Sequence, residues 1–206
     1  MLKRTMYKIN GACVTAGFMV LGPIQNNVYF ITDGAATFVV DPTCDPDALV
    51  EALGGVKLDA IVITHRHYDH IGAAACLAQR TGATVIASEI DAPYIAGELP
   101  DPDGHPGSDP CPVDQRVSDG DVVQLGGMAW RVISTPGHTP GSMCLFLDPR
   151  FGSDAAGAPL LISGDTLFCG SIGRTDFAGG SMDDMRHSLK KLATLPDNTI
   201  VLPGHN

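Results

Sequence analysis

Five of the seven histidines of this chain lie in three short motifs, and each motif directly follows an apolar run typical of a buried strand. The densest motif covers residues 64–70 (THRHYDH). At strand-like spacing, side chains at positions i and i+2 project to the same side, so His65 and His67 can bind one ion. Asp69 and His70 begin the next turn and can point to a second position nearby. Imidazole and carboxylate groups are ligands of divalent metals, so the motif predicts a metal site.

Three further candidate ligands follow other strand-like runs. His138 stands in residues 134–142 (STPGHTPGS), where Pro and Gly on both sides favour a rigid turn that presents one imidazole. Asp165 follows the run 160–162, and a carboxylate can bridge two cations more readily than an imidazole can. His205 ends a Pro-Gly-His sequence that repeats the arrangement around His138. Seven ligands suit two ions, each with three or four protein ligands and an open position.

The elements that position these motifs are predicted to be strands mixed with helices. The β-rich runs 28–32 and 37–40 flank Asp33-Gly34, which predicts a hairpin. Asp45-Pro46 predicts the start of a helix that ends at Gly54-Gly55. The other predicted elements are helices at 71–80 and 181–195 and strands within 11–22 and at 60–64, 83–87, 121–125, 128–134, 143–147, 160–162 and 199–202. This pattern predicts a sheet core with helices outside and functional side chains in the loops at strand ends.

The charge and composition exclude several classes of protein. The chain has 13 Lys and Arg against 23 Asp and Glu, a formal net charge of −10, which disfavours nucleic-acid binding. No stretch approaches the ~20 apolar residues of a membrane helix, and the run 11–22 is interpreted as the first strands, not as a signal peptide. The six cysteines form no CxxC pair, which favours reduced thiols and a cytoplasmic protein.

The ordered set of HxHxDH, a later His, an Asp and a final His resembles the metallo-β-lactamase superfamily, from about Val28 to His205. The resemblance implies an α/β fold, a four-layer αββα sandwich with the site at one edge of the two sheets. It also implies a single domain over residues 1–206. By the family pattern the first metal would be held by His65, His67 and His138 and the second by Asp69, His70 and His205, with Asp165 bridging them.

Residues 164–177 (GDTLFCGSIGRTDF) are similar to the short glyoxalase II-like, or hydroxyacylglutathione hydrolase-like, enzymes of this superfamily. This similarity implies hydrolysis of a small thioester, such as an S-2-hydroxyacyl thiol. Two divalent ions, zinc first and iron or manganese otherwise, would hold the attacking hydroxide, and Asp69 or Asp165 would orient it as catalytic residues. β-Lactamases of the main zinc classes usually have Cys in place of Asp165, so antibiotic hydrolysis is not expected.

Full glyoxalase II proteins add a helical domain that binds glutathione. The chain ends at Asn206, so we expect no C-terminal glutathione-binding helical domain in it. A substrate pocket would then come from loops or from a partner subunit. The metal, the acyl group, the thiol carrier and the oligomeric state stay open.

Three rival functions fit the same motifs. Persulfide dioxygenases of this superfamily use a single iron on two His and one Asp, here His138 and Asp165 with His65 or a neighbour. Two His and a carboxylate with open positions are the ligand set of oxygen chemistry at non-haem iron. A lactone or ester hydrolase of the same fold is a second alternative, and a non-catalytic metal-binding module is a third. Metal content and oxygen consumption discriminate among them.

Residues 97–113 contain five prolines and three glycines and are predicted to form a long loop over or near the site. Arg174 and Asp176 are predicted to form an internal ion pair that shapes the loop behind the metals. Five other side chains are predicted to lie outside the site, as a buried small hydrophobe, as packing residues or on the surface: Cys169, Tyr68 and Tyr94, and His105 and His187.

Overall fold

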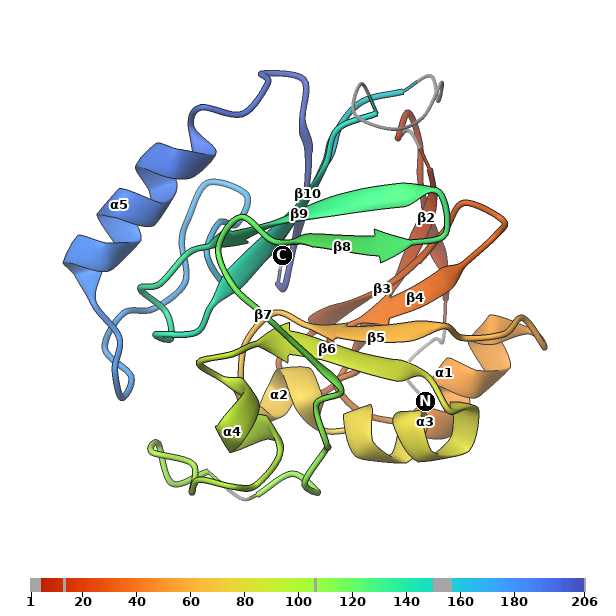
Figure 1. Cartoon of the computed structure of the whole chain (residues 1–206), viewed down its shortest axis with the longest axis horizontal. Helices are drawn as coiled ribbons and strands as arrows, with labels where there is room; N and C mark the ends of the chain where they lie inside the picture. The colour runs from red at the N-terminus through yellow and green to blue at the C-terminus, as the bar shows by residue number, and fades with distance from the viewer. Residues whose placement is uncertain (1–4, 13, 106, 150–156, 206) are drawn as a thin grey trace.

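The fold consists of two β-sheets that pack face to face, with helices on both outer faces (Figure 1). The computed structural model describes residues 5–12, 14–105, 107–149 and 157–205. The first sheet has the strand order β1 (Tyr7–Ile9), β2 (Thr15–Leu21), β3 (Asn26–Thr32), β4 (Thr37–Val40), β5 (Ala60–Ile63), β6 (Thr84–Ser88), β7 (Gln115–Val117). The second has the order β12 (Ile200–Pro203), β11 (Leu160–Gly164), β10 (Met143–Leu147), β9 (Met128–Ser134), β8 (Val122–Leu125). The helices are α1 (Pro46–Leu53), α2 (Tyr68–Ile71), α3 (Ala74–Thr81), α4 (Ala92–Ile95) and α5 (Met182–Leu192).

Three clusters of apolar side chains fill the space between neighbouring layers. Between the two sheets, the fully buried Trp130 ring packs edge-on against Phe38, with ring centroids 5.4 Å apart. A second cluster joins the outer face of the seven-stranded sheet to α1 and α3, and a third places Leu192 of α5 against the five-stranded sheet. The predicted four-layer αββα sandwich is therefore confirmed.

The helix boundaries follow the local sequence. Asp45 caps α1 by accepting a hydrogen bond from the Ala48 N–H at 3.1 Å, Pro46 occupies the first turn, and Gly54 ends the helix in the left-handed conformation. Ser181 caps α5 through the Asp184 N–H. These capping residues confirm the two predicted helix starts.

The predicted helix at 71–80 is wrong in one respect, because the structure has two helices, α2 and α3, in this region. The Ala73 N–H donates to the Pro42 carbonyl at 2.8 Å instead of continuing a helix. A side chain at Gly72 would collide with the Thr43 carbonyl, so the chain passes this point at close range. Helix α2, before the break, contains the predicted ligands Asp69 and His70.

The short elements β1, β7 and α4 are absent from the sequence prediction. They contain three or four residues, which is too short for a periodic pattern to be recognised. The cysteines that the structure describes, Cys44, Cys76, Cys111, Cys144 and Cys169, are free, as predicted; Cys13 lies outside the described residues. Among the described residues, no helix is long and apolar enough to cross a membrane.

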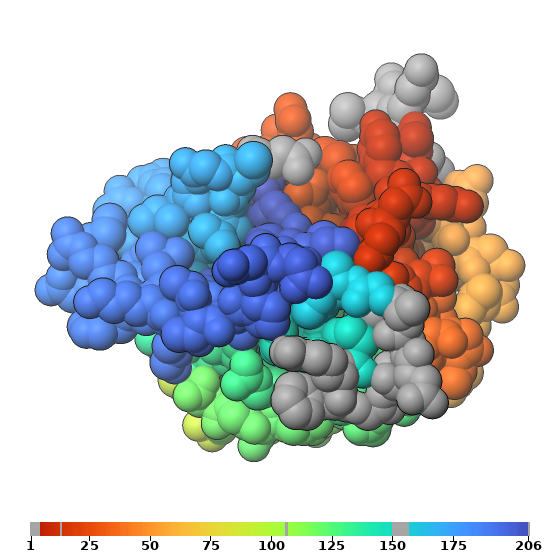
Figure 2. Space-filling view, turned by 90° about the horizontal axis from the view of Figure 1, so that it is seen from above, coloured from red at the N-terminus to blue at the C-terminus, as the bar shows by residue number. Residues whose placement is uncertain are grey.

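The C-terminal segment lies beside the N-terminal strands, as the view from above shows (Figure 2). The Asn27 N–H donates to the Gly204 carbonyl at 2.8 Å, and the Tyr29 hydroxyl donates to the Pro203 carbonyl at 2.7 Å. These bonds connect the end of β12 to β3 and so hold the two sheets together at the edge where the candidate site lies.

Candidate metal centre

The structure brings all seven predicted site residues together at one edge of the two sheets. The seven-stranded sheet contributes the loop after β5 and helix α2, whereas the five-stranded sheet contributes the segments after β9, β11 and β12. The side chains form two groups of three with one carboxylate between them.

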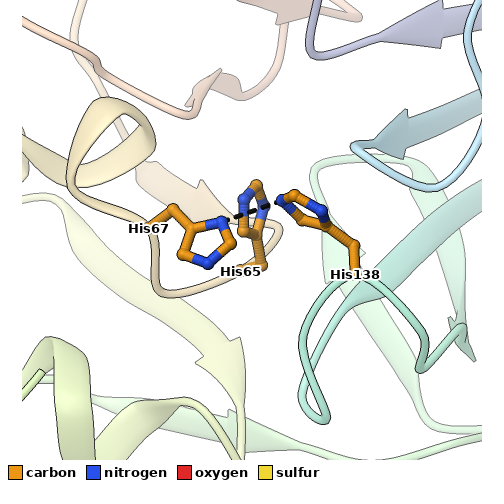
Figure 3. A group of neighbouring side chains, drawn as sticks. All are labelled: His65, His67 and His138. Carbon is orange, nitrogen blue, oxygen red and sulfur yellow. Dashed lines mark hydrogen bonds between the residues drawn. The ribbon is translucent and has the colours of Figure 1, made fainter. Parts of the chain in front are cut away.

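The first group consists of His65, His67 and His138, all of them buried. One ring nitrogen from each lies within 4.8 Å of the others. The Nδ1 atom of His67 is 2.8 Å from the Nε2 atom of His138, and the His65 ring lies close to both (Figure 3). This group can hold a metal ion.

The second group consists of Asp69, His70 and His205, whose ligand atoms also lie within 4.8 Å of one another. The Oδ2 atom of Asp69 is 3.4 Å from Nε2 of both histidines. Asn26 donates to the same oxygen at 2.8 Å and fixes the carboxylate in place.

Asp165 lies between the two groups and contacts both. Its Oδ2 atom is 3.5 Å from Nε2 of His138 and 3.4 Å from Nε2 of His205, and its Oδ1 atom is 3.4 Å from Nε2 of His70. A side chain at Gly204 would overlap this carboxylate and the His70 ring, which explains why glycine precedes His205. The Asp165 carboxylate is therefore within 3.5 Å of histidines from both groups.

The ring nitrogens that point away from the site contact oxygen atoms. His138 Nδ1 donates to the Arg174 carbonyl at 2.7 Å, and His205 Nδ1 donates to the Ile24 carbonyl at 3.1 Å. His70 Nδ1 is 2.9 Å from Asp41 Oδ2, and Asp41 is itself held by the Thr64 N–H and hydroxyl. Because the neutral His138 ring carries its proton on Nδ1, its Nε2 presents a lone pair to the site, and the oxygen partners of His70 and His205 fix the orientation of those two rings.

The two groups differ in their protonation. Burial and the neighbouring His138 and His70 lower the pKa of His67 to about 4, and burial also lowers the pKa of His65 and His138. Burial alone would lower the pKa of His205, but its hydrogen bonds to Asp165 and Asp69 outweigh this and raise the pKa to about 9. Burial likewise opposes ionisation of Asp69 and Asp165, yet the adjacent His205 and His70 hold the pKa of both carboxyls far below their usual range.

Several buried polar atoms support the fit of a cation to this site. Among the described residues, His65 Nε2 and Asp165 Oδ1 have no hydrogen-bond partner although both are buried. Such atoms are costly unless something pairs with them. Neutral imidazoles and ionised carboxylates are the donor set that zinc and iron accept. The residues present therefore fit divalent metal ions.

Five residues around the site are absent from the sequence prediction. Asn26, at the start of β3, and Asp41 and Asp103, in loops, contact predicted ligands, whereas Arg66 and Asp91 form a buried ion pair beside them. Only Asp41 has a signal in the sequence, because it directly follows a strand, as His65 and Asp165 do.

The prediction that the loop 97–113 lies over or near the site is confirmed, because Asp103 Oδ2 is 3.6 Å from His67 Nε2. The prediction that His105 is a surface residue is wrong. Its side chain is only 28% exposed, and its ring lies 4.8 Å from Tyr68 and 6.4 Å from His67. His187 is exposed, and Tyr94 packs beneath the Arg66 guanidinium, both as predicted.

Two predictions about residues 169–176 need correction. Arg174 and Asp176 do form an ion pair, at 2.7 Å, but each side chain is 66% exposed, so the pair is not internal. The backbone carbonyl of Arg174, not its guanidinium, contacts the site. Cys169 is exposed and not buried, because the turn after β11 carries it into solvent.

The comparison with protein families identifies the class. A family model described as the metallo-beta-lactamase superfamily matches residues 21–205, so the chain belongs to this superfamily. Similar curated proteins include a probable metallo-hydrolase, YqgX, of Bacillus subtilis (32% identical, 91% of this chain and 88% of the relative). The hydroxyacylglutathione hydrolase of Acidiphilium cryptum is 36% identical over 88% of this chain and 64% of its own length. The hydroxyacylglutathione hydrolase GloC of Haemophilus influenzae is 30% identical, with 88% and 85% covered.

Solved structures with the same fold include three that are at least 30% identical to this chain. The BLEG-1 B3 metallo-beta-lactamase is 30% identical with a TM-score of 0.78, over 93% of this chain and 91% of the other. A di-iron-bound form of TTHA1623 is 32% identical with a TM-score of 0.75, over 92% and 91%. ETHE1 from Myxococcus xanthus is 30% identical with a TM-score of 0.70, over 92% and 74%.

Proposed function

We propose that this protein is a hydrolase that holds two divalent metal ions, most suitably zinc, and hydrolyses a small thioester. The observation that carries the proposal is the position of Asp165, whose carboxylate contacts histidines of two separate groups. One group would be His65, His67 and His138, the other Asp69, His70 and His205, and Asp165 would serve both.

Bound divalent ions would supply a Lewis acid for the thioester carbonyl and would lower the pKa of an attacking water. The chain's own residues provide the positioning. Asp69, fixed by Asn26, and Asp165 are ionised carboxylates that would accept hydrogen bonds from that water and orient it. The outer hydrogen bonds of His70, His138 and His205 keep their rings aimed inward.

The thioester substrate is favoured by the similarity to hydroxyacylglutathione hydrolases. The chain spans 64% of the length of the Acidiphilium hydrolase and 85% of the length of the Haemophilus hydrolase. Hydrolases with this name therefore include one that is little longer than this chain. We therefore propose an S-2-hydroxyacyl thiol as the substrate class.

Iron-dependent oxidation is the second candidate, favoured by the similarity to ETHE1 from Myxococcus xanthus and by the His and Asp donor set. It would require oxygen uptake with a persulfide, which a hydrolase does not show.

The proposal is tested with S-lactoylglutathione, a lactone, a β-lactam and a persulfide as alternative substrates of the metal-loaded full chain. We expect thioester hydrolysis, and Asp165→Asn should reduce it by at least about a hundredfold, which corresponds to about 2.7 kcal/mol of transition-state stabilisation. The matched control is Asp197→Asn, an exposed aspartate in the turn after α5, which should retain full activity. Turnover of only the lactone, the β-lactam or the persulfide would contradict the thioester proposal.

A further inference from the structure

The aspartate of the long loop 97–113 faces the outer nitrogen of one histidine of the first group. Asp103 Oδ2 lies 3.6 Å from His67 Nε2, and both atoms are buried without a hydrogen-bond partner among the described residues. The Asp103 side chain is only 7% exposed. The two atoms would form a hydrogen bond only if His67 Nε2 carried a proton that it could donate to the carboxylate.

The hydrogen bonds of His138 determine where that proton lies. The Arg174 carbonyl can only accept, so His138 carries its proton on Nδ1 and presents a lone pair on Nε2. His67 Nδ1 is 2.8 Å from that lone pair, so in this structure the neutral His67 ring carries its proton on Nδ1. His67 Nε2 then presents a lone pair to the Asp103 carboxylate, which accounts for the unbonded distance.

A cation held by this group needs lone pairs on both His67 Nδ1 and His138 Nε2. The Nδ1–H bond of His67 must then break and an Nε2–H bond must form, and the ring stays neutral because one proton is lost and one gained. We propose that Asp103 is the positioning residue of His67, because its carboxylate accepts this Nε2–H hydrogen bond when a cation is bound. The inference rests on the proposed metal binding by the first group and not on the thioester.

Asp103 is itself anchored from two sides. Its Oδ1 atom accepts a hydrogen bond from the Ala178 N–H at 2.7 Å, and its Oδ2 atom lies 3.9 Å from the Arg66 guanidinium. The Arg66 guanidinium also donates to the Ala178 carbonyl at 2.7 Å. The carboxylate therefore couples the loop 97–113 and the segment around Ala178 to the first metal position.

The first test uses the wild-type full chain labelled with ¹⁵N. Long-range proton–nitrogen correlation spectra of the His67 ring are recorded after chelation and after titration with Zn²⁺. We expect the proton on Nδ1 after chelation and, with zinc, on Nε2, where it exchanges slowly with water. An Nδ1 proton in the zinc form, or an Nε2 proton that exchanges freely, would overturn the proposal.

The second test compares Asp103→Asn with Asp109→Asn, an exposed aspartate of the same loop. An asparagine has one oxygen and cannot serve both the Ala178 N–H and the His67 N–H. Zinc affinity is measured by competition with a chromophoric chelator, and we expect roughly 10- to 100-fold weaker binding only in Asp103→Asn. Unchanged affinity in Asp103→Asn, or equal weakening in both variants, would contradict the assignment. Because neither test uses a substrate, a protein that hydrolyses no thioester would overturn the proposed function and leave this inference standing.

Discussion

The histidines of the two groups in the site differ in their protonation state at neutral pH. In the first group, burial keeps the imidazoles neutral, and the pKa of His67 falls to about 4. In the second group, the carboxylates of Asp165 and Asp69 raise the pKa of His205 to about 9, against the effect of burial. The pKa of His70 is raised as well, by Asp165 and Asp41, so at neutral pH a metal ion must displace protons in the second group but not from His67.

This difference predicts that the two metal positions respond differently to acid. Between pH 8 and pH 6, affinity for the second ion should fall by at least about tenfold per pH unit, because protons compete for His205 and for His70, whose pKa is also raised. Affinity for the first ion should change little until the pH approaches about 4. Zinc titration by calorimetry at several pH values measures both. Equal pH dependence of the two ions would contradict the protonation described here.

The chelated protein provides an independent test of His205. Its pKa is raised from 6.5 to about 9 in the folded chain, so its contribution to stability is fully present below pH 6.5 and lost as the pH rises through 9. Urea unfolding of the chelated wild type should therefore show a loss of stability between pH 6.5 and 9 that is smaller in His205→Gln, where only the raised pKa of His70 still contributes. The same slope in both proteins would assign the effect to other groups.

At the scale of the elements, one buried ion pair connects several loops of the site. Arg66, between the first two histidines, donates from its backbone and its guanidinium to Asp91, at 3.0 Å in each case. The Thr139 hydroxyl, next to His138, donates to the same carboxylate at 2.8 Å. The ion pair therefore fixes the loop after β5 relative to the loop after β9.

Removal of one member of the Arg66–Asp91 ion pair should lower the free energy of unfolding. Asp91→Ala leaves the Arg66 guanidinium buried without its carboxylate, and we expect a loss of about 3–5 kcal/mol in the free energy of unfolding. Urea denaturation measures this. Asp47→Ala, which breaks an exposed ion pair with Arg80, is the control and should leave the midpoint unchanged. A similar small effect in both variants would show that the buried pair is not structural.

Local patterns in the sequence predict the strands, the capped helices and the seven residues that meet at the site, because periodicity and residue type are encoded over a few positions. Other features depend on contacts between distant segments. The break between α2 and α3 is set by Pro42 and Thr43, and Asp103 reaches His67 from a loop without regular structure. The wrong predictions for Cys169 and His105 have the same origin, because a loop's path decides exposure and no local pattern specifies it.

At the scale of the whole molecule, the candidate site lies across the joint between the two sheets. Each group of three takes side chains from both sheets, so bound ions would hold the sheets together. The chain has a single tryptophan, Trp130, fully buried between the sheets against Phe38, and its fluorescence reports the separation of the layers.

Chelation should therefore lower the stability of the whole protein. At free zinc a hundredfold above the dissociation constant, each occupied position adds about 2.7 kcal/mol to the free energy of unfolding. Urea unfolding followed by Trp130 fluorescence, with zinc and with chelator, measures the difference. A midpoint that chelation leaves unchanged would contradict metal binding across the two sheets.

The proposed thioester hydrolysis requires two metal ions with Asp165 between them. Metal content per chain and S-lactoylglutathione hydrolysis, measured on the same purified sample, test it most directly. We expect about two metal ions per chain and hydrolysis that disappears together with the metal. About one iron per chain, no hydrolysis and oxygen uptake with a persulfide would contradict it.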